Sequence, residues 1–228
     1  MRCWIGKVIS SALLSAAVLM AQIVSAQVGA QWVARYNGPT DSGDKAKAVA
    51  VDSSGNVYVT GESVGSGTGT DFATVKYGAD GSVVWTARYN GPDNDNDSAV
   101  AIALDGSSYV CVTGQSYGSG TGVDYATVKY NATNGAEEWV ARYNAADSVD
   151  SPHAIAVDSS GNVYVTGESF DSTSGYDYAT VKYNASNGSQ AWVARHNGPG
   201  NGVDRAYGIA VDGGSVYVTG GSYDSGTG

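Results

Sequence analysis

The sequence predicts an all-β protein, a β-propeller built from four-stranded blades of about 53 residues. Three markers recur at this interval. Trp32, Trp85, Trp139 and Trp192 are 53, 54 and 53 residues apart, the Thr-Gly pairs begin at residues 60, 113, 166 and 219, and Ala-Thr-Val-Lys-Tyr occupies 73–77, 126–130 and 179–183. A β-helix would have a much shorter period, and a β-sandwich would not need to repeat itself.

Each unit contains four candidate strands. In the first complete unit they are Ala46–Val51, Asn56–Gly61, Phe72–Tyr77 and Val83–Tyr89. Apolar residues alternate with small or polar ones in these segments, and turns such as Asp-Ser-Ser-Gly-Asn at 158–162 separate them. No segment beyond the N-terminal leader has the apolar stripe of an amphipathic helix. We expect the first strand of each unit to line the central axis and the Trp strand to be outermost.

The strand pattern predicts blades at about 38–90, 91–144 and 145–197, and an incomplete blade at 198–228. This amounts to about three and a half blades, an open arc or a truncated propeller. Residues 31–37 are predicted to be an outer strand that would complete the last blade of a closed ring. Since the fourth unit has only its first two strands, unpaired strand edges should remain, and we expect self-association through them.

The N-terminus has the pattern of a secretory signal peptide spanning residues 1–26. Arg2 and Lys7 precede an apolar run from Val8 to Met20, and Val-Ser-Ala at 24–26 places small residues where cleavage after Ala26 requires them. The run is too short and too interrupted to span a bilayer, so we expect no membrane span after cleavage. The repeat region is then 27–228, and the protein is expected to be secreted, periplasmic or on the cell surface.

Charge and cysteine content exclude further classes. Loss of Arg2 and Lys7 changes the net charge from −10 to −12, which argues against binding to nucleic acid because phosphates are bound by cations. Cys111 is then the single cysteine, and it occupies the slot that tyrosines hold in the sister units. We expect it to be buried and inert.

The repeated motifs resemble a known family. The run Asp-x-Ala-x-Ala-Ile-Ala-Val-Asp-x-x-Gly-Asn-Val-Tyr-Val-Thr-Gly, followed by Asp-Tyr-Ala-Thr-Val-Lys-Tyr and Trp-Val-Ala-Arg-Tyr-Asn-Gly-Pro, is similar to the bacterial SBBP-type β-propeller repeat. The resemblance covers residues 31–228. It implies an exported or surface-exposed propeller that is commonly part of a larger protein, and it implies no defined activity.

Two sets of carboxylates are candidate binding sites. Asp93, Asp95 and Asp97 resemble the start of a Ca²⁺ loop but lack the downstream Gly and Glu, so the sequence favours a solvated loop and leaves Ca²⁺ as the alternative. An Asp also recurs two residues before the innermost strand of every unit, at Asp44, Asp97, Asp150 and Asp204. We interpret these four as structural turn carboxylates, and the alternative is a ring that binds cations or hydroxyl-rich ligands.

Recurrent basic and aromatic residues have predicted structural roles. The lysines and arginines of the third and fourth strands should lie near the rim, with their heads paired to acids in exposed ion pairs worth about 0–1 kcal/mol each. The lysines are Lys76, Lys129 and Lys182, the arginines are Arg88, Arg142 and Arg195, and the acids are Asp71, Asp124 and Asp177. Trp85, Trp139 and Trp192 are predicted to anchor the packing between blades.

No catalytic or cofactor-binding residue is predicted. Gly-x-Ser-x-Gly occurs at 61–65 and 114–118, but no helix follows either copy and no His recurs to act as a base. The sequence therefore predicts a non-catalytic exported scaffold or interaction module with a protein or glycan ligand. The alternative is a carbohydrate-active or other enzyme with a site on the propeller face, which should break the repeat with paired carboxylates or a His cluster.

Overall fold

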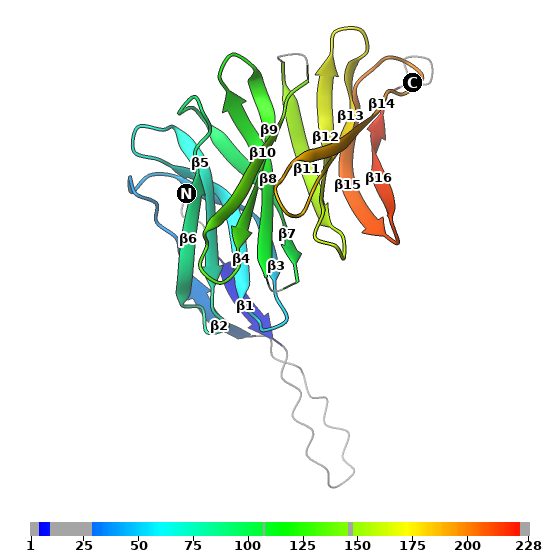
Figure 1. Cartoon of the computed structure of the whole chain (residues 1–228). Coiled ribbons are helices and arrows are strands. Elements are labelled where there is room, and N and C mark those ends of the chain that lie inside the picture. The colour runs from blue at the N-terminus through cyan, green and yellow to red at the C-terminus, as the bar shows by residue number, and fades with distance from the viewer. Residues whose placement is uncertain (1–4, 10–28, 107, 146–147, 224–228) are drawn as a thin grey trace, which may run out of the picture.

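The computed structural model describes residues 5–9, 29–106, 108–145 and 148–223. Consecutive strands form three four-stranded antiparallel sheets, with a two-stranded sheet at either end of the series. Figure 1 shows the sheets side by side as an open fan that runs from β1 and β2 to β15 and β16. The predicted all-β propeller arc is therefore confirmed.

The strands follow chain order within each sheet. The first blade contains β3 (Asp44–Val51), β4 (Val57–Val64), β5 (Thr70–Tyr77) and β6 (Val83–Tyr89). The second contains β7 (Asp97–Asp105), β8 (Tyr109–Gly118), β9 (Gly122–Asn131) and β10 (Glu137–Tyr143). The third contains β11 (Asp150–Val157), β12 (Val163–Asp171), β13 (Gly175–Tyr183) and β14 (Gln190–His196). The end sheets are β1 (Ile5–Ile9) with β2 (Gly29–Ala34), and β15 (Asp204–Asp212) with β16 (Ser215–Ser222).

Local turn chemistry closes the hairpin that opens the first and the third blade. Between β3 and β4, one oxygen of Asp52 accepts hydrogen bonds from the backbone N–H groups of Ser54 and Asn56, both at 2.9 Å. Gly55 has a φ of 80°, which side-chain-bearing residues rarely adopt. Asp158 makes the same contacts in the third blade. The same turn forms in both blades because both contain the sequence Asp-Ser-Ser-Gly-Asn.

The first strands of the blades lie next to one another on the inside of the arc. β7 lies between β3 and β11, and β11 is in turn next to β15. The Trp-bearing strands β6, β10 and β14 are at the opposite edge of their sheets. This confirms the predicted order of strands from the axis to the rim.

The hydrophobic core is divided between the blade junctions. One cluster joins Tyr58, Phe72 and Trp85 of the first blade to Val110 and Val112 of the second, and another joins the second blade to the third. Cys111 belongs to the second cluster and is fully buried, as predicted. Burial raises the pKa of its thiol to about 12.

The strand β1 was not anticipated. It lies inside the predicted signal peptide and pairs antiparallel with β2, with Lys7 opposite Trp32. Lys76 is likewise opposite Trp85 in the first blade, so β1 takes the position of a third strand beside β2. The rest of the predicted leader, residues 1–4 and 10–26, lies outside the described residues. Cleavage after Ala26 stays a prediction.

The predicted outer strand at 31–37 overlaps β2, which ends at Ala34. It packs on the first blade, where the Trp32 indole N–H donates to the Ala79 carbonyl at 3.0 Å. It pairs with β1 rather than with β16, so the described part of the ring is open. Within that part, the structure has no helix that could cross a membrane.

Candidate functional site

An arginine on the fourth strand is the centre of a polar cluster that recurs in each complete blade. In the second blade, Arg142 donates to Ser116 Oγ at 2.6 Å, to the Ser116 carbonyl at 2.9 Å and to Asp124 Oδ2 at 2.7 Å. It also donates to Tyr89 Oη of the preceding blade at 2.9 Å. One guanidinium therefore joins three strands of its own blade to the neighbouring blade.

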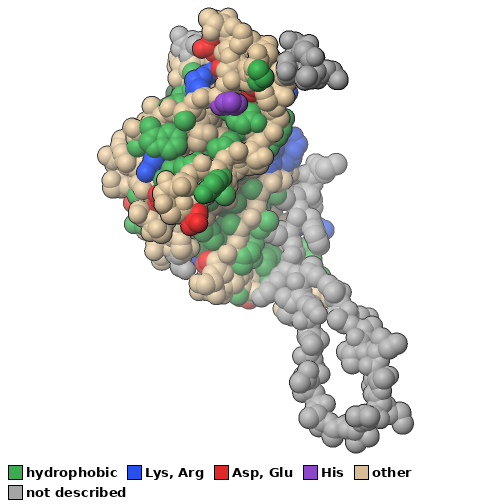
Figure 2. Space-filling model, turned by 90° about the vertical axis from the view of Figure 1, so that its right-hand side faces the viewer, with side chains coloured by type: hydrophobic (Ala, Val, Ile, Leu, Met, Phe, Trp, Pro, Cys, Tyr) green, Lys and Arg blue, Asp and Glu red, His purple; other side chains and the backbone are tan. Residues whose placement is uncertain are grey.

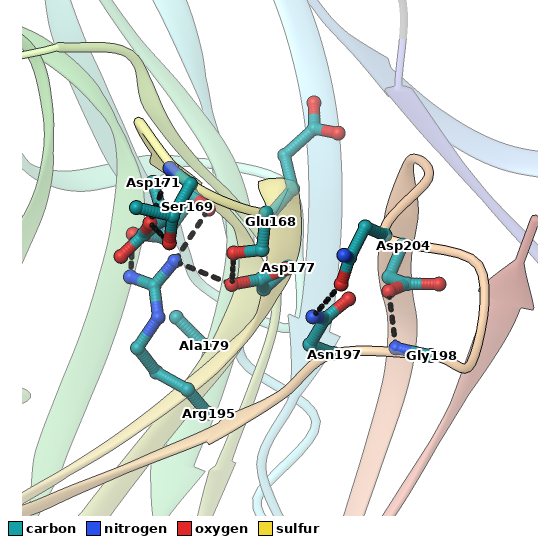
Figure 3. Close-up of polar contacts among 12 residues, drawn as sticks. Glu168, Ser169, Asp171, Asp177, Ala179, Arg195, Asn197, Gly198 and Asp204 are labelled. Atoms are coloured by element: carbon teal, nitrogen blue, oxygen red, sulfur yellow. Dashed lines mark hydrogen bonds and ion pairs between the residues drawn. The ribbon is translucent and has the colours of Figure 1, made fainter.

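The same cluster occurs in the other two complete blades. Arg88 contacts Ser63, Asp71 and Tyr36, and Arg195 contacts Ser169, Asp177 and Tyr143. Figure 3 shows the third copy, with Arg195 pointing toward Ser169 and Asp177. Sequence analysis did not assign the serines or tyrosines to the arginines, although both recur at the interval of the Trp and Thr-Gly markers.

The predicted partners of the basic residues need correction. The arginines do pair with the expected acids, but these pairs are not on an exposed rim, because the three carboxylates are almost fully buried. The lysines do not share those acids. Lys76 donates to the Ala132 carbonyl of the next blade at 2.8 Å and lies over the ring of Tyr58. Its position opposite Trp85 on the neighbouring strand directs it toward the turn that contains Ala132.

The four recurrent loop carboxylates are buried at the start of each first strand. Each accepts a hydrogen bond from a backbone N–H in the turn before its own strand: Asp44 from Gly38, Asp97 from Gly91, Asp150 from Ala145 and Asp204 from Gly198. Figure 3 shows the Asp204 pair. These contacts close the connection from one blade to the next.

Asp97 and Asp150 lie where burial disfavours the charged form of a carboxyl group. Burial raises the pKa of Asp97 more than hydrogen bonds from Ser116 and Gly91 lower it, and the pKa of Asp150 is raised for the same reason. Their Oδ1 atoms have no protein hydrogen-bond partner.

The candidate Ca²⁺ residues do not point to a common centre. Asp97 is buried and bonded to Gly91, whereas Asp93 and Asp95 are exposed in the turn. One Asp95 oxygen accepts from both the backbone and the side chain of Asn96. Among the residues that the structure describes, no three acidic, His or Cys side chains gather as a metal site would require. Binding of Ca²⁺ here stays an untested alternative.

Tryptophans connect each blade to the next one along the chain. The Trp85 indole N–H donates to the Ala132 carbonyl at 3.0 Å, and Trp139 donates to the Ala185 carbonyl at 3.2 Å. Both indoles are buried, but Trp192 is 37% exposed, so its predicted role as an anchor is only partly correct. The two-stranded sheet β15–β16 provides no turn equivalent to those that cover Trp85 and Trp139.

A second polar link between blades occurs on the inner strands. Glu62 accepts hydrogen bonds from Lys45 and from Ser98 of the next blade, each at 2.7 Å. Gln115 and Glu168, at the equivalent positions, contact Ser151 and Arg205 of their next blades. Sequence analysis did not single out this position, because its side chain differs between units.

The serines of the two Gly-x-Ser-x-Gly motifs are not arranged for nucleophilic attack. Ser63 and Ser116 are fully buried, and each accepts a hydrogen bond from an arginine, which cannot act as a general base. The arrangement stabilises the blades.

Comparison with known proteins agrees with this geometry. A family profile described as SBBP, a beta-propeller repeat, matches residues 31–73 and 138–169. These two segments of the chain are therefore similar to the SBBP β-propeller repeat. The first match begins within β2 and ends within β5, and the second begins at Glu138 on β10 and ends at Ser169 on β12. No curated protein matches the sequence significantly.

Solved structures include similar propellers. The crystal structure of BamB from Moraxella catarrhalis aligns with a TM-score of 0.51 at 16% identity, over 84% of this chain and 50% of that chain. At this identity the likeness shows the fold alone. The chain spans about half the length of BamB.

The Glu62 link predicts a pH dependence. Burial alone would raise the Glu62 pKa, but hydrogen bonds from Lys45, Ser98 and Lys47 outweigh it and lower the pKa to about 2. Its stabilisation is therefore fully present above about pH 4.5, the pKa of an unperturbed Glu, and is lost as pH falls toward 2. Urea unfolding should show Glu62→Gln less stable than wild type at pH 7 and equal to it near pH 2. An equal deficit at both pH values would contradict this expectation. The second blade has Gln115 at the equivalent position, so a glutamine side chain fits there.

Proposed function

We propose that the protein is an exported, non-catalytic propeller scaffold, an interaction module that belongs to a larger surface or secreted assembly. The SBBP repeats and the BamB-like fold support the propeller scaffold. The N-terminal leader supports export. The ligand is a protein or a glycan that the propeller binds through surfaces outside its structural clusters.

The observation that carries the proposal is the aromatic surface at the β15–β16 end. Tyr217 is 61% exposed, whereas its equivalents Tyr58 and Tyr164 are buried by their own Trp strands. Tyr207, Tyr223 and Val203 are also exposed there. Figure 2 views this end of the molecule and shows hydrophobic side chains gathered on it. Large exposed apolar patches mark interaction surfaces.

The absence of catalysis is supported by the symmetry of the polar groups. Each complete blade uses its arginine, serine and aspartate in the same structural contacts, whereas an active site is expected to break the repeat with residues that the other units lack. Turnover of a glycan by the purified protein, abolished by a substitution that leaves folding intact, would support the carbohydrate-active alternative.

Substitution of Tyr217 tests the interaction surface. Tyr217→Thr keeps a residue suited to a strand but removes the exposed ring, so self-association measured by sedimentation velocity should weaken. Tyr117→Thr, which removes another exposed ring on β8, is the matched control and should behave as wild type. Equal association of all three proteins would exclude the β15–β16 surface.

Mass spectrometry of protein recovered outside the cytoplasm should show an N-terminus at Gln27.

A further inference from the structure

Aromatic rings on third strands fit over glycines of the next blade at every described junction from the first blade onward. A Cβ atom at Gly114 would lie 2.7 Å from Phe72 Cζ, and one at Gly220 would lie 2.7 Å from Tyr178 Oη. At Gly167 the corresponding distance to Tyr125 Oη is 2.8 Å. Only glycine leaves room for these rings. We call the surface over such a glycine the ring socket.

The first blade has a ring socket that the described residues leave empty. A pocket lies over Gly61, and its lining includes Tyr36, Ala46 and Ala73. The atoms nearest to a Cβ at Gly61 all belong to the adjacent strand β3, and none comes from an aromatic ring. Ala46 is exposed, whereas its equivalent Ala99 is fully buried under the filled socket of the second blade.

Tyr36 provides the second wall of the empty socket. In the filled sockets the inserted ring also contacts a ring of the fourth strand beside it: Phe72 contacts Tyr89 at 5.2 Å, Tyr125 contacts Tyr143 at 5.3 Å and Tyr178 contacts His196 at 5.6 Å, measured between centroids. Tyr36 follows Trp32 by four residues, as Tyr89 follows Trp85. Tyr36 packs against the cluster that contains Val59 and Val75, and no described third strand inserts a ring beside it as Phe72 does beside Tyr89.

The edge of β2 already accepts a strand in the required register. Lys7 of β1 is opposite Trp32, which reproduces Lys76 opposite Trp85. A strand in this register that carries an aromatic residue four positions before its lysine, as Phe72 precedes Lys76, would place the ring opposite Tyr36. In β1 that position lies outside the described residues.

We propose that the Gly61 socket, with the edge of β2, is a docking site for the third strand of another blade of this repeat. The occupant is an extended segment of the Tyr-Ala-Thr-Val-Lys type, and its aromatic ring enters between Tyr36 and Ala46. Tyrosine fits better than phenylalanine, because Tyr125 Oη in the filled socket donates to the carbonyls of Glu168 and Ala179. Their equivalents, Glu62 and Ala73, offer the same acceptors at the first blade.

A labelled peptide with the sequence of residues 175–183, Gly-Tyr-Asp-Tyr-Ala-Thr-Val-Lys-Tyr, is the probe. Its binding would be followed by fluorescence polarisation with the full chain and with a form that lacks residues 1–26, because β1 competes for the edge of β2. We expect saturable binding to at least one form. Replacing the peptide residue that corresponds to Tyr178 by Ala should weaken binding by about tenfold or more, and replacement by Phe should weaken it less.

The protein variant Ala46→Phe separates this site from the edge of β16. Its ring should fill the socket and abolish binding, whereas Val51→Phe, about 17 Å away along the same strand, should bind as wild type. Peptide binding that Ala46→Phe leaves unchanged, or that neither chain form shows, would overturn the proposal. This site rests on the proposed interaction role but lies at the opposite end from Tyr217, so the two can fail separately.

Discussion

Replacing Arg142 by methionine is expected to lower the free energy of unfolding by about 3 kcal/mol. Within the described residues the guanidinium is the only ion-pair partner of Asp124, whose side chain is 3% exposed. Removing it leaves a buried carboxylate with a neutral hydrogen bond from Thr121 but no compensating charge. Breaking buried pairs of this kind typically costs about 3–5 kcal/mol, and the lower end applies because the arginine itself is 24% exposed. Urea unfolding of purified variants measures the effect.

Arg35 provides a matched control for Arg142. It holds the same position relative to Trp32 that Arg88 holds relative to Trp85, but it is exposed and has no ion pair within the described residues. Arg35→Met should therefore change stability by less than about 0.5 kcal/mol. In a double-mutant cycle, Asp124→Leu should recover part of the loss caused by Arg142→Met. A loss below 1 kcal/mol for Arg142→Met would show that the cluster is as weak as an exposed pair.

Trp139→Ala is expected to cost about 3–5 kcal/mol, enough to unfold its own blade at moderate temperature. The indole is 7% exposed, donates to the Ala185 carbonyl and lies against Gly188 of the next blade. Its removal leaves a cavity at the junction and takes one hydrogen bond from the Ala185 carbonyl, which keeps the one that Lys129 donates.

Trp192→Ala is the matched comparison for Trp139→Ala. Trp192 packs on Tyr164 of its own blade but has no next-blade turn over it among the described residues, so its loss should cost about 1 kcal/mol. Differential scanning calorimetry of both variants would separate the two sites. Equal losses would mean that the tryptophans stabilise their own sheets and do not join blades.

The repeat period made the fold predictable, because strand alternation and turn residues recur with it. The four strands of each blade and their order from the axis to the rim follow from segments such as Phe72–Tyr77. The partners of the charged groups were not predictable in the same way. The alternation of each strand places Lys76 and Arg88 on its polar face, and the sequence pattern does not distinguish their partners. The packing of one blade on the next determines that the arginine pairs with Asp71 while the lysine contacts the next blade.

Two further features depend on contacts that local sequence does not report. Trp192 begins the same Trp-Val-Ala-Arg sequence as Trp139, yet its exposure depends on whether another blade covers it. The pairing of β1 with β2 could not be predicted from the sequence. The composition of the leader indicates export but gives no information about strand pairing or register. In both cases the neighbouring blade, rather than the local segment, decides the environment.

The open arc is tested most directly by multi-angle light scattering of the full chain over a wide concentration range. An arc with an exposed aromatic surface at β15–β16 and an empty ring socket at Gly61 should associate, so the measured mass should rise to at least twice that of one chain. A mass of one chain at every concentration, with a single cooperative unfolding transition, would contradict it.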